Sequence, residues 1–396
     1  GEGESTTDVV FTGHNMIAEN GALLAERRFA AGLTIAEIDV GRLLYDRRRM
    51  NTFAPPASTP LDDAHGLGIG RSAFSLERTA VKLRRDVSPA PFIPDNAADR
   101  AARCEEILTI AALGLKKRLE HTGAKTAVVG LSGGLDSTLA LLITALAMGM
   151  LNRPASDIIA ITMPCFGTTD RTKNNAVILA ERMGATLRTV PIGETVKSHF
   201  RDIGQSMADQ NVTYENAQAR ERTQVLMDVA NQTGGLVIGT GDLSELALGW
   251  CTYNGDHMSM YAVNASIPKT LVRHLVDYVA RDNLGKDEEL TRVLEDILDT
   301  PVSPELLPAV QGEISQRTED LVGPYELHDF FLYHIVRWGF GPRKVLRLAE
   351  LAMGRTYSRD VILKWLHSFC RRFFSQQFKR SCIPDGPKVG SVALSP

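Results

Sequence analysis

Short apolar runs alternate with longer amphipathic segments through the middle of the chain. Four short runs predict strands, at residues 126–130, 157–163, 186–192 and 235–239, and the apolar composition of the first two is typical of buried strands. Apolar residues at helical spacing predict helices around them, at residues 96–121, 136–150, 172–183 and 216–232. Strands that alternate with helices through short loops are typical of an α/β fold with a doubly wound parallel sheet and right-handed crossovers.

The pattern changes after residue 266, where helical spacing prevails. It predicts helices over 270–282 and 286–298 and through most of 326–374. We therefore expect a mostly helical C-terminal part after the sheet.

The N-terminal pattern differs again. Alternating apolar residues on both sides of Glu19-Asn20-Gly21 predict a β-hairpin, residues 34–40 predict a further strand, and residues 41–50 predict a short basic helix. The region that follows carries six prolines and little periodicity, which is typical of a connector. The first part has too few large apolar residues to bury a core alone. The predicted divisions are an N-terminal part at 1–50, a Pro-rich linker at 51–99 and a main domain at 100–396.

Composition narrows the class of protein. With 396 residues, 44% hydrophobic and 23% charged, the chain is an ordinary globular protein of two or three domains. A net charge of −3 gives no general attraction to nucleic acid or to an acidic membrane. The longest apolar run, 139–151, is too short to span a bilayer, and no signal peptide is visible. Five cysteines without CxxC spacing favour a reducing cytoplasm over a disulfide scaffold or zinc ribbon.

The strongest chemical signal is GLSGGLDST at residues 130–138, between the first predicted strand and its helix. The first N–H groups of a helix lack intrahelical partners and bind anions, and glycines let the backbone approach a phosphate. The hydroxyls of Ser132, Ser137 and Thr138 offer further donors. Neither GxxxxGK[ST] nor GxGxxG is present, which argues against a Walker loop and a dinucleotide-binding Rossmann site.

The remaining pattern, SGGxDS, resembles the loop of ATP pyrophosphatases, also called PP-loop enzymes. Those enzymes cleave ATP between the α- and β-phosphates, and the loop holds the departing pyrophosphate. The alternative is an ordinary Ser/Gly turn in which Ser or Asp caps a helix.

Two carboxylates are expected at the same edge of the sheet. Ligands of open parallel sheets bind at the carboxyl ends of the strands. The strand at 235–239 leads into GTGDLSE, so Glu245 should emerge beside Asp136. Mg²⁺ prefers carboxylate and phosphate oxygens, which makes these two residues its predicted ligands. A solvated acid at a helix start is the alternative for Glu245.

Two loops and one helix face offer contacts for nucleotides. The loop 164–169 could hold adenine, and Cys165 within it is interpreted as a pocket or packing residue because no histidine partner follows. Asn216, Arg220 and Thr223 share one helix face, unless that helix is simply exposed and charged. Residues 249–269 are rich in aromatics, Asn and Gly, and could form a wall for a flat heteroaromatic ligand.

Two further segments need an interpretation. His257 has no second His or Cys at ligand spacing, so we interpret it as a surface or hydrogen-bonding histidine. Residues 369–388 mix Arg and Lys with aromatics, which could indicate nucleic-acid binding. Because the net charge is near neutral, closure over phosphates is favoured instead.

The sequence resembles the synthetase domain of glutamine-dependent NAD synthetases in five segments. They are, in this order, GLSGGLDSTLAL, ENAQARERT, GLVIGTGDLSELALGW, the stretch 264–269 and QFKRSCIPDGPK. The resemblance runs from about Arg100 to the C-terminus. Residues 1–50, with GESTTD and the hairpin, resemble the tail of the nitrilase-like glutaminase domain that precedes the synthetase in this family. We therefore expect both ends of the protein, and the glutaminase catalytic residues, to lie outside this sequence.

The resemblance implies a C–N ligase that amidates deamido-NAD to NAD through an acyl-adenylate. ATP is the co-substrate, Mg²⁺ the metal, and AMP and pyrophosphate the products. Ammonia would come from glutamine through the glutaminase, or directly from solution in this fragment. The family analogy also implies a homo-oligomer, with no nucleic-acid or membrane partner.

By position, the resemblance assigns roles to individual residues. The implied catalytic residues are Asp136, Glu245 and Lys269, of which Asp136 and Glu245 hold the metal. The implied ATP-binding residues are Gly130, Leu131, Ser132, Gly133, Gly134, Leu135, Asp136, Ser137, Thr240 and Ser303. The implied deamido-NAD-binding residues are Asn216, Arg220, Glu245, Trp250, Cys251, Thr252, Tyr253, Asn254, Gly255 and Lys379.

Two alternatives stay open at this point. Another PP-loop amidotransferase or adenylating enzyme, such as a GMP synthetase, an asparagine synthetase or a tRNA-modifying enzyme, would share SGGxDS. The segments GTGDLSE and 250–255 argue against it. A non-catalytic nucleotide-binding module would lack the metal carboxylates, which are present here.

Overall fold

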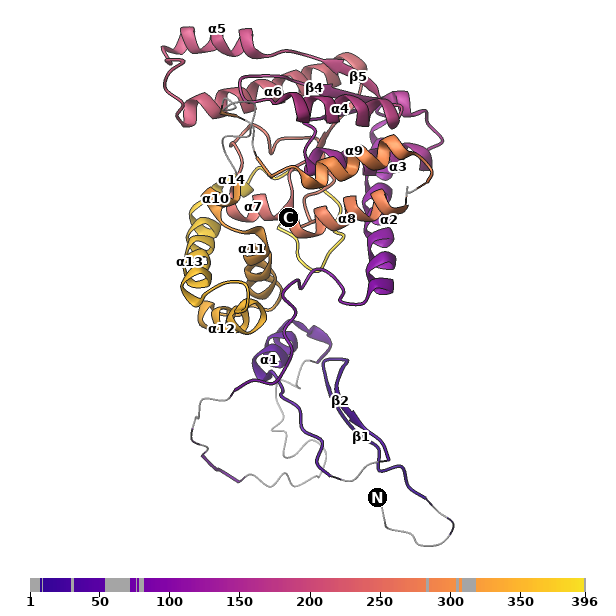
Figure 1. Cartoon of the computed structure of the whole chain (residues 1–396), viewed down its shortest axis with the longest axis vertical. Helices are drawn as coiled ribbons and strands as arrows, with labels where there is room; N and C mark the ends of the chain where they lie inside the picture. Colours follow the sequence, from indigo (N-terminus) through magenta and orange to yellow (C-terminus); the bar gives the residue numbers. More distant parts are fainter. Residues whose placement is uncertain are drawn as a thin grey trace. The chain divides into compact units, whose positions relative to one another are not determined.

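The computed structural model describes residues 8, 10–29, 32–53, 72–75, 77, 82–282, 285–303, 306–307 and 318–394. The chain divides into two compact units, residues 1–87 and 88–396 (Figure 1). Within the described residues, every helix is too short or too polar to cross a bilayer.

The first unit contains the predicted hairpin. Strands β1 (Asn15–Glu19) and β2 (Ala22–Arg27) pair antiparallel. The turn residues Asn20 and Gly21 have φ of 49° and 82°, the left-handed values that a two-residue hairpin turn requires. Residues 54–71, 76 and 78–81 of the predicted linker lie outside the described residues.

The predicted strand at 34–40 is wrong. Residues 33–39 form no regular structure, and helix α1 (Val40–Arg49) begins directly after them. The Asp39 side chain accepts a hydrogen bond from the Arg42 backbone N–H at 3.0 Å, which caps this helix. Such a local cap competes with strand pairing, and alternation alone does not reveal it.

The second unit is built on a five-stranded parallel sheet. The spatial order β5-β4-β3-β6-β7 places β3 at the centre, and all four predicted strands are confirmed. The chain moves outward from β3 to β5 and then returns to the other side of β3, so the switch point for ligand binding lies between β3 and β6. The bounds are β3 Ala127–Gly130, β4 Ile158–Thr162, β5 Thr186–Thr189, β6 Leu236–Gly239 and β7 Tyr261–Ala262, the last being too short for a pattern to reveal.

Helices cover both faces of the sheet, and alternate strand residues face each layer. In β3, Ala127 and Val129 join one buried cluster, whereas Val128 joins another. The first cluster packs α2 (Ala97–Thr122), α3 (Leu135–Met150), α4 (Asp170–Arg182), α8 (Lys269–Asp282) and α9 (Glu288–Asp299). The second packs α5 (Gly193–Ile203) and α6 (Val212–Thr233), which lie apart from α8 and α9 in Figure 1. The predicted helices 96–121, 136–150, 172–183 and 216–232 are thus confirmed, with α5 added.

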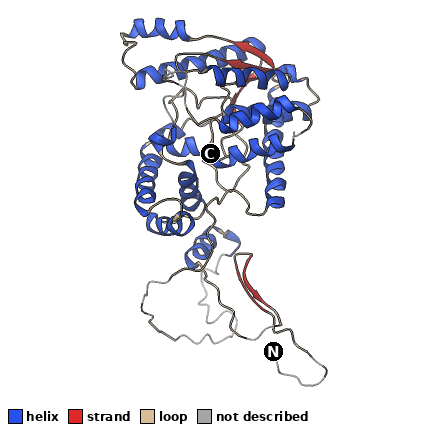
Figure 2. Cartoon of the chain, viewed as in Figure 1, coloured by secondary structure: helices blue, strands red, loops and turns tan. Residues whose placement is uncertain are grey.

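The C-terminal part is mostly helical, as predicted (Figure 2). Helix α11 continues into a π-helical turn, Tyr333–Arg337, and packs against α7, α8 and α13. This contact matters because α7 and α8 carry residues of the site described next. The bounds are α7 Leu243–Leu248, α10 Thr318–Val322, α11 Tyr325–Leu332, α12 Pro342–Met353, α13 Arg359–Ser375 and α14 Gln377–Arg380.

Candidate active site

The predicted phosphate loop turns from β3 into α3 at the switch point. Gly133 has φ of +85°, and a Cβ there would lie 2.0 Å from the carbonyl oxygen of Thr172. Only glycine fits such a position. Gly134 is the N-cap of α3 and supplies no side-chain cap, so the first N–H groups of this helix keep their capacity to bind an anion.

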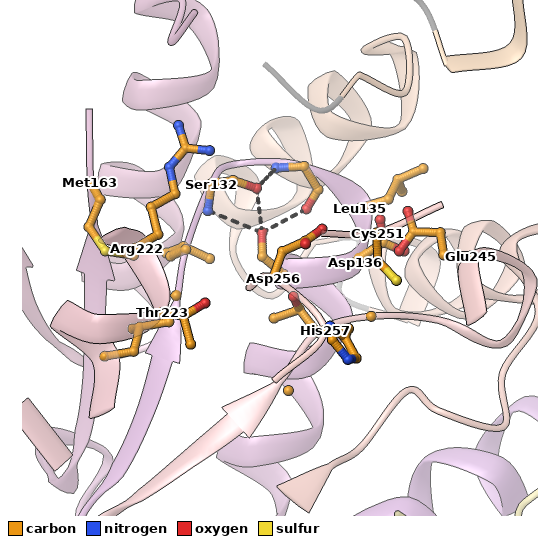
Figure 3. A pocket seen from close by; sticks show the side chains of 18 of the residues that line it. Ser132, Leu135, Asp136, Met163, Arg222, Thr223, Glu245, Cys251, Asp256 and His257 are labelled. Atoms are coloured by element: carbon orange, nitrogen blue, oxygen red, sulfur yellow. Dashed lines mark hydrogen bonds between the residues drawn. The ribbon is translucent and has the colours of Figure 1, made fainter. Parts of the chain in front are cut away.

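Serine hydroxyls brace the loop. Ser132 Oγ and Ser137 Oγ are 3.1 Å apart, and the Ser132 N–H donates to Ser137 Oγ at 3.3 Å (Figure 3). The hydroxyls of Ser137 and Thr138 both donate to the Gly134 carbonyl, at 3.1 and 2.8 Å. Ser132 and Ser137 therefore brace the loop through each other, whereas among the described residues the Thr138 hydroxyl bonds only to this carbonyl at the start of α3.

Three carboxylates meet next to this loop. Asp136 in the first turn of α3, Asp242 at the N-cap of α7 and Glu245 in α7 present oxygens within 4.8 Å of one another. The sequence predicted Asp136 and Glu245 and missed Asp242, although the GTGD motif places Asp242 shortly after β6. The Lys269 ammonium lies 2.6 Å from Asp136, 2.9 Å from Asp242 and 2.9 Å from Glu245. We call these four residues the acidic cluster.

Burial governs the electrostatics of the acidic cluster. The Lys269 side chain is 4% exposed and that of Asp242 is fully buried. Burial alone would lower the pKa of Lys269, but the three carboxylates outweigh it and hold that pKa well above the usual value. Burial raises the pKa of Asp242 well above its usual value against the pull of Lys269, and raises that of Glu245 to about 7. Lys269 therefore stays an ammonium among closely packed acids.

Asn264 joins the two strand ends that carry the site. Its fully buried amide donates to the Asp136 carbonyl at 2.9 Å and to the Thr240 carbonyl at 3.0 Å. One side chain therefore ties the start of α3 to the segment after β6. The sequence had drawn attention to 264–269 without giving Asn264 this role.

A cavity of about 250 Å³ lies against the loop and the acidic cluster. Met163, Arg222 and Thr223 lie on the far side of it from Asp136 and Glu245 (Figure 3). Gly133 and Lys269 do not line it, although both contribute to the loop and cluster beside it. The predicted residues that line it are Gly130, Leu131, Ser132, Gly134, Leu135, Asp136, Ser137, Thr240, Glu245, Cys251 and Ser303.

The comparison with known proteins identifies the family. The family model described as NAD synthase matches residues 107–360. The chain belongs to the NAD synthase family.

Curated relatives in this family agree with that assignment. The chain is 42% identical over 427 residues to the glutamine-dependent NAD(+) synthetase of Mycobacterium tuberculosis, covering 100% of this chain and 62% of the relative. It is 30% identical to that of Synechocystis over 84% of this chain and 55% of the relative. The chain therefore spans less than two thirds of the length of these relatives. The alternative that it belongs to another PP-loop family is set aside.

Solved structures match the fold. A glutamine-dependent NAD(+) synthetase from Cytophaga hutchinsonii aligns with a TM-score of 0.59 at 18% identity, over 73% of this chain and 53% of that one. An NMN synthetase from Francisella tularensis aligns with a TM-score of 0.53 at 23% identity, over 69% and 95%. The predicted α/β fold of the PP-loop type is thereby confirmed for this NAD synthase family member.

Of the residues predicted for the second nucleotide, Glu245 and Cys251 line the cavity of about 250 Å³. A smaller cavity of about 130 Å³ is lined by Trp250 together with Asp136 and Glu245. Neither cavity is lined by Asn216, Arg220, Thr252, Tyr253, Asn254, Gly255 or Lys379. The Thr252 hydroxyl donates to Asn216 Oδ1 at 2.7 Å, and Arg220 Nε donates to the Tyr253 carbonyl at 3.4 Å. In this NAD synthase family member, α6 and the segment after α7 thus form one wall.

The turn 252–257 is internally bonded. The Thr252 N–H donates to Asp256 at 2.6 Å, and His257 Nδ1 lies 2.8 Å from the Thr252 carbonyl, which confirms the hydrogen-bonding interpretation of His257. Asn254 takes φ of 52°, and a Cβ at Gly255 would lie 2.8 Å from the Thr252 side chain. Asp256 and His257, which the sequence placed only within the predicted wall 249–269, line the cavity of about 250 Å³.

Two cysteines near the site are not activated. Burial raises the pKa of the Cys251 thiol to about 12. Cys165 packs, with Phe166, against the cluster of α5 and α6, which confirms its interpretation as a packing residue, while Thr168 of the same loop lines the cavity. Neither thiol is therefore prepared to act as a nucleophile.

The basic C-terminal segment binds carbonyl groups. Lys379 donates to the carbonyls of Gly249 and Cys251 at 2.9 and 2.7 Å. Arg372 and Arg380 donate to the carbonyls of Leu248 and Ala247. These three cations complement the C-terminus of α7, where carbonyls lack intrahelical partners. The structure shows carbonyl partners for these three cations, and closure of the segment over phosphates stays a prediction.

Proposed function

We propose that this chain catalyses the ATP-dependent amidation of deamido-NAD to NAD. ATP would activate the nicotinate carboxylate as an acyl-adenylate, and ammonia would displace AMP. The observation that carries this proposal is the contact between the phosphate loop and the acidic cluster in a chain of the NAD synthase family.

The acidic cluster fits a divalent cation. Three carboxylates and one ammonium leave two net negative charges if all are ionised, and Asp136 Oδ1 is buried without a hydrogen-bond partner among the described residues. We propose that Asp136 and Glu245 hold Mg²⁺, which prefers such oxygens. Mg²⁺ would supply positive charge to the phosphates of ATP. Asp242, fully buried against Lys269, would hold that lysine in place.

Different residues of the chain would bind different parts of the substrates. The first N–H groups of α3, with Ser132 and Ser137, would bind the departing pyrophosphate. Gly130, Leu131, Thr240 and Ser303 would contact ATP, with adenosine towards Met163 and Thr223. Lys269 would place a fixed positive charge near the reacting phosphate. Since both reactants are held by rigid helices, alignment supplies much of the rate.

Deamido-NAD would occupy the wall next to the acidic cluster. Trp250 and Tyr253 offer ring surfaces, and Asn216, Arg220 and Thr252 offer polar groups. Its carboxylate would then lie near Glu245 and the α-phosphate. Lys379 orders this wall through its bonds to two carbonyls and keeps one N–H for the ligand.

The proposal that glutamine supplies the ammonia concerns longer proteins of this family. We propose that residues 1–50 are the tail of a nitrilase-like glutaminase domain, joined through 51–99 to the synthetase at 100–396, in a homo-oligomer. The 396-residue chain would take ammonia from solution. Its five free cysteines support a cytoplasmic setting.

One assay tests the proposed function. The chain is incubated with deamido-NAD, ATP, Mg²⁺ and ammonium, and NAD, AMP and pyrophosphate are measured. Equal amounts of the three products are expected. Xanthosine monophosphate replaces deamido-NAD as the control, since a GMP synthetase-like enzyme would amidate it. ADP in place of AMP, or no NAD, would contradict the proposal.

A further inference from the structure

A third cavity, of about 630 Å³, is lined by Lys269, Thr270 and Asp329. Asp329 of α11 is a buried carboxylate outside the two cavities next to the phosphate loop. It is 2% exposed, and its first oxygen accepts a hydrogen bond from the Ser244 hydroxyl. Its second oxygen accepts from the Thr270 N–H at 3.0 Å and from the Thr270 hydroxyl at 2.7 Å. A buried carboxylate is costly unless its oxygens are bonded, and here both are.

The two partners of Asp329 are sequence neighbours of acidic-cluster residues. Ser244 precedes Glu245 in α7, and Thr270 follows Lys269 in α8. Asp329 therefore clamps the two helices at the points where each presents a charged side chain to the site. The clamp comes from α11, which packs against both helices.

The clamp also caps α8. Lys269 is the first residue of that helix, and its backbone N–H donates to Ser244 Oγ at 2.8 Å. With the bond from Thr270 to Asp329, two of the N–H groups that a helix start leaves without intrahelical partners are satisfied from other helices. The charge of Asp329 also complements the helix dipole. The backbone of Lys269 is thus fixed independently of its side chain.

We propose that Asp329 is a positioning residue that acts through Ser244 and the start of α8 to hold Lys269 against Asp136, Asp242 and Glu245. The inference rests on the proposed function and extends it. The precision matters because the Lys269 ammonium lies within 2.9 Å of all three carboxylates. A small shift of the α8 start would lengthen all three contacts together.

The first test is Asp329→Asn in the full chain, assayed for NAD formation from ammonium. Ser244 and Thr270 donate to different oxygens of Asp329, and an amide replaces one of these two acceptors with an NH2 donor. We expect kcat to fall by about 10- to 100-fold, with the KM for ATP changed by less than about threefold. Asp360→Asn removes an exposed acid from the first turn of α13 and should leave kcat unchanged. Urea unfolding confirms that each variant is folded under assay conditions.

A double-mutant cycle separates positioning from general stability. Ser244→Ala cuts the same connection, so Asp329→Asn and Ser244→Ala together should lower kcat no more than the stronger single change. Thr270→Val loses the hydroxyl donor and should lower kcat, whereas Thr270→Ser keeps it and should restore kcat. If Asp329→Asn does not fold, the comparison of Thr270→Val with Thr270→Ser tests the inference instead.

Three results would overturn the inference. They are a folded Asp329→Asn variant with the kcat of the parent chain, additive losses in the double variant, and equal kcat for Thr270→Val and Thr270→Ser. An unmodified chain that forms no NAD would instead contradict the proposed function.

Discussion

The ammonium of Lys269 lies 2.6 Å from a carboxylate oxygen of Asp136, across 133 residues of sequence. Asp136 lies in the first turn of the helix that follows the phosphate loop, and Lys269 is the first residue of the helix that follows the last strand. This contact joins the predicted phosphate site to the rest of the acidic cluster. The predictions below test the parts of this arrangement separately.

Asp136→Asn should abolish pyrophosphate release while the chain stays folded. Lys269 keeps Asp242 and Glu245, each at 2.9 Å, and one source of repulsion between acids is lost. We expect kcat to fall by at least about 100-fold, as when a preorganised charge is removed from an active site. Pyrophosphate release and the urea midpoint are measured beside Asp360→Asn. Turnover equal to that of the parent chain would remove Asp136 from the metal site.

Gly133→Ala should damage both the fold and ATP use. The φ of +85° and the approach of 2.0 Å to the Thr172 carbonyl leave no room for a methyl group. We expect a loss of about 1–3 kcal/mol in the free energy of unfolding, with a raised KM for ATP. Gly149→Ala is the matched control, because a Cβ there meets nothing within 4 Å. It should instead stabilise α3 by up to about 1 kcal/mol. If both variants behaved alike, the loop geometry would be wrong.

His328 should make the chain less stable in mild acid. Burial lowers its pKa to about 4, from an ordinary value near 6.5, so the unfolded chain takes up the proton first. The stability that depends on neutral His328 is complete above about pH 6.5 and is lost as the pH falls towards 4. Between pH 8 and pH 5 the loss should be about 2 kcal/mol.

The comparison variant for that experiment is His328→Phe, which keeps a ring beside Phe369. Burial raises the pKa of Asp329 to about 6. Protonation of Asp329 therefore stabilises the folded chain as the pH falls over this range, which opposes the effect of His328. Because both proteins carry Asp329, its contribution cancels in the difference of their urea unfolding curves. Parallel pH dependence of the two proteins would show that His328 is not the titrating group.

Nitrogen source should distinguish this chain from its longer relatives. The chain spans 62% of the length of the Mycobacterium tuberculosis relative, and we expect NAD from free ammonium but none from glutamine. The measurement is NAD formed with each nitrogen source at saturating ATP and deamido-NAD. Sustained activity with glutamine alone would place a glutaminase within these 396 residues.

The sequence by itself determined four strands of the sheet, the helices between them and the phosphate loop. Each depends on a local pattern: an apolar run, a Gly turn and a helix start lie within residues 126–150, and alternation with short loops leaves few possible topologies. Asp136 and Glu245 could be paired because both follow strands of one parallel sheet. The strand predicted at residues 34–40 was wrong because alternating apolar and polar residues occur both in strands and in irregular segments. Here the Asp39 side chain caps a helix instead.

Only the tertiary structure decided which charges meet. Asp242 is part of the GTGD motif, but the sequence does not show that it is fully buried against Lys269, because that depends on how α7 and α8 pack. Asp329 reaches Ser244 across 85 residues, and the basic C-terminal segment binds carbonyls of α7 across more than 120. From the sequence alone, a charged residue could face solvent, bind phosphate or pair with a buried group. Its burial and neighbours, which set its energy and its pKa, arise only when distant elements pack together.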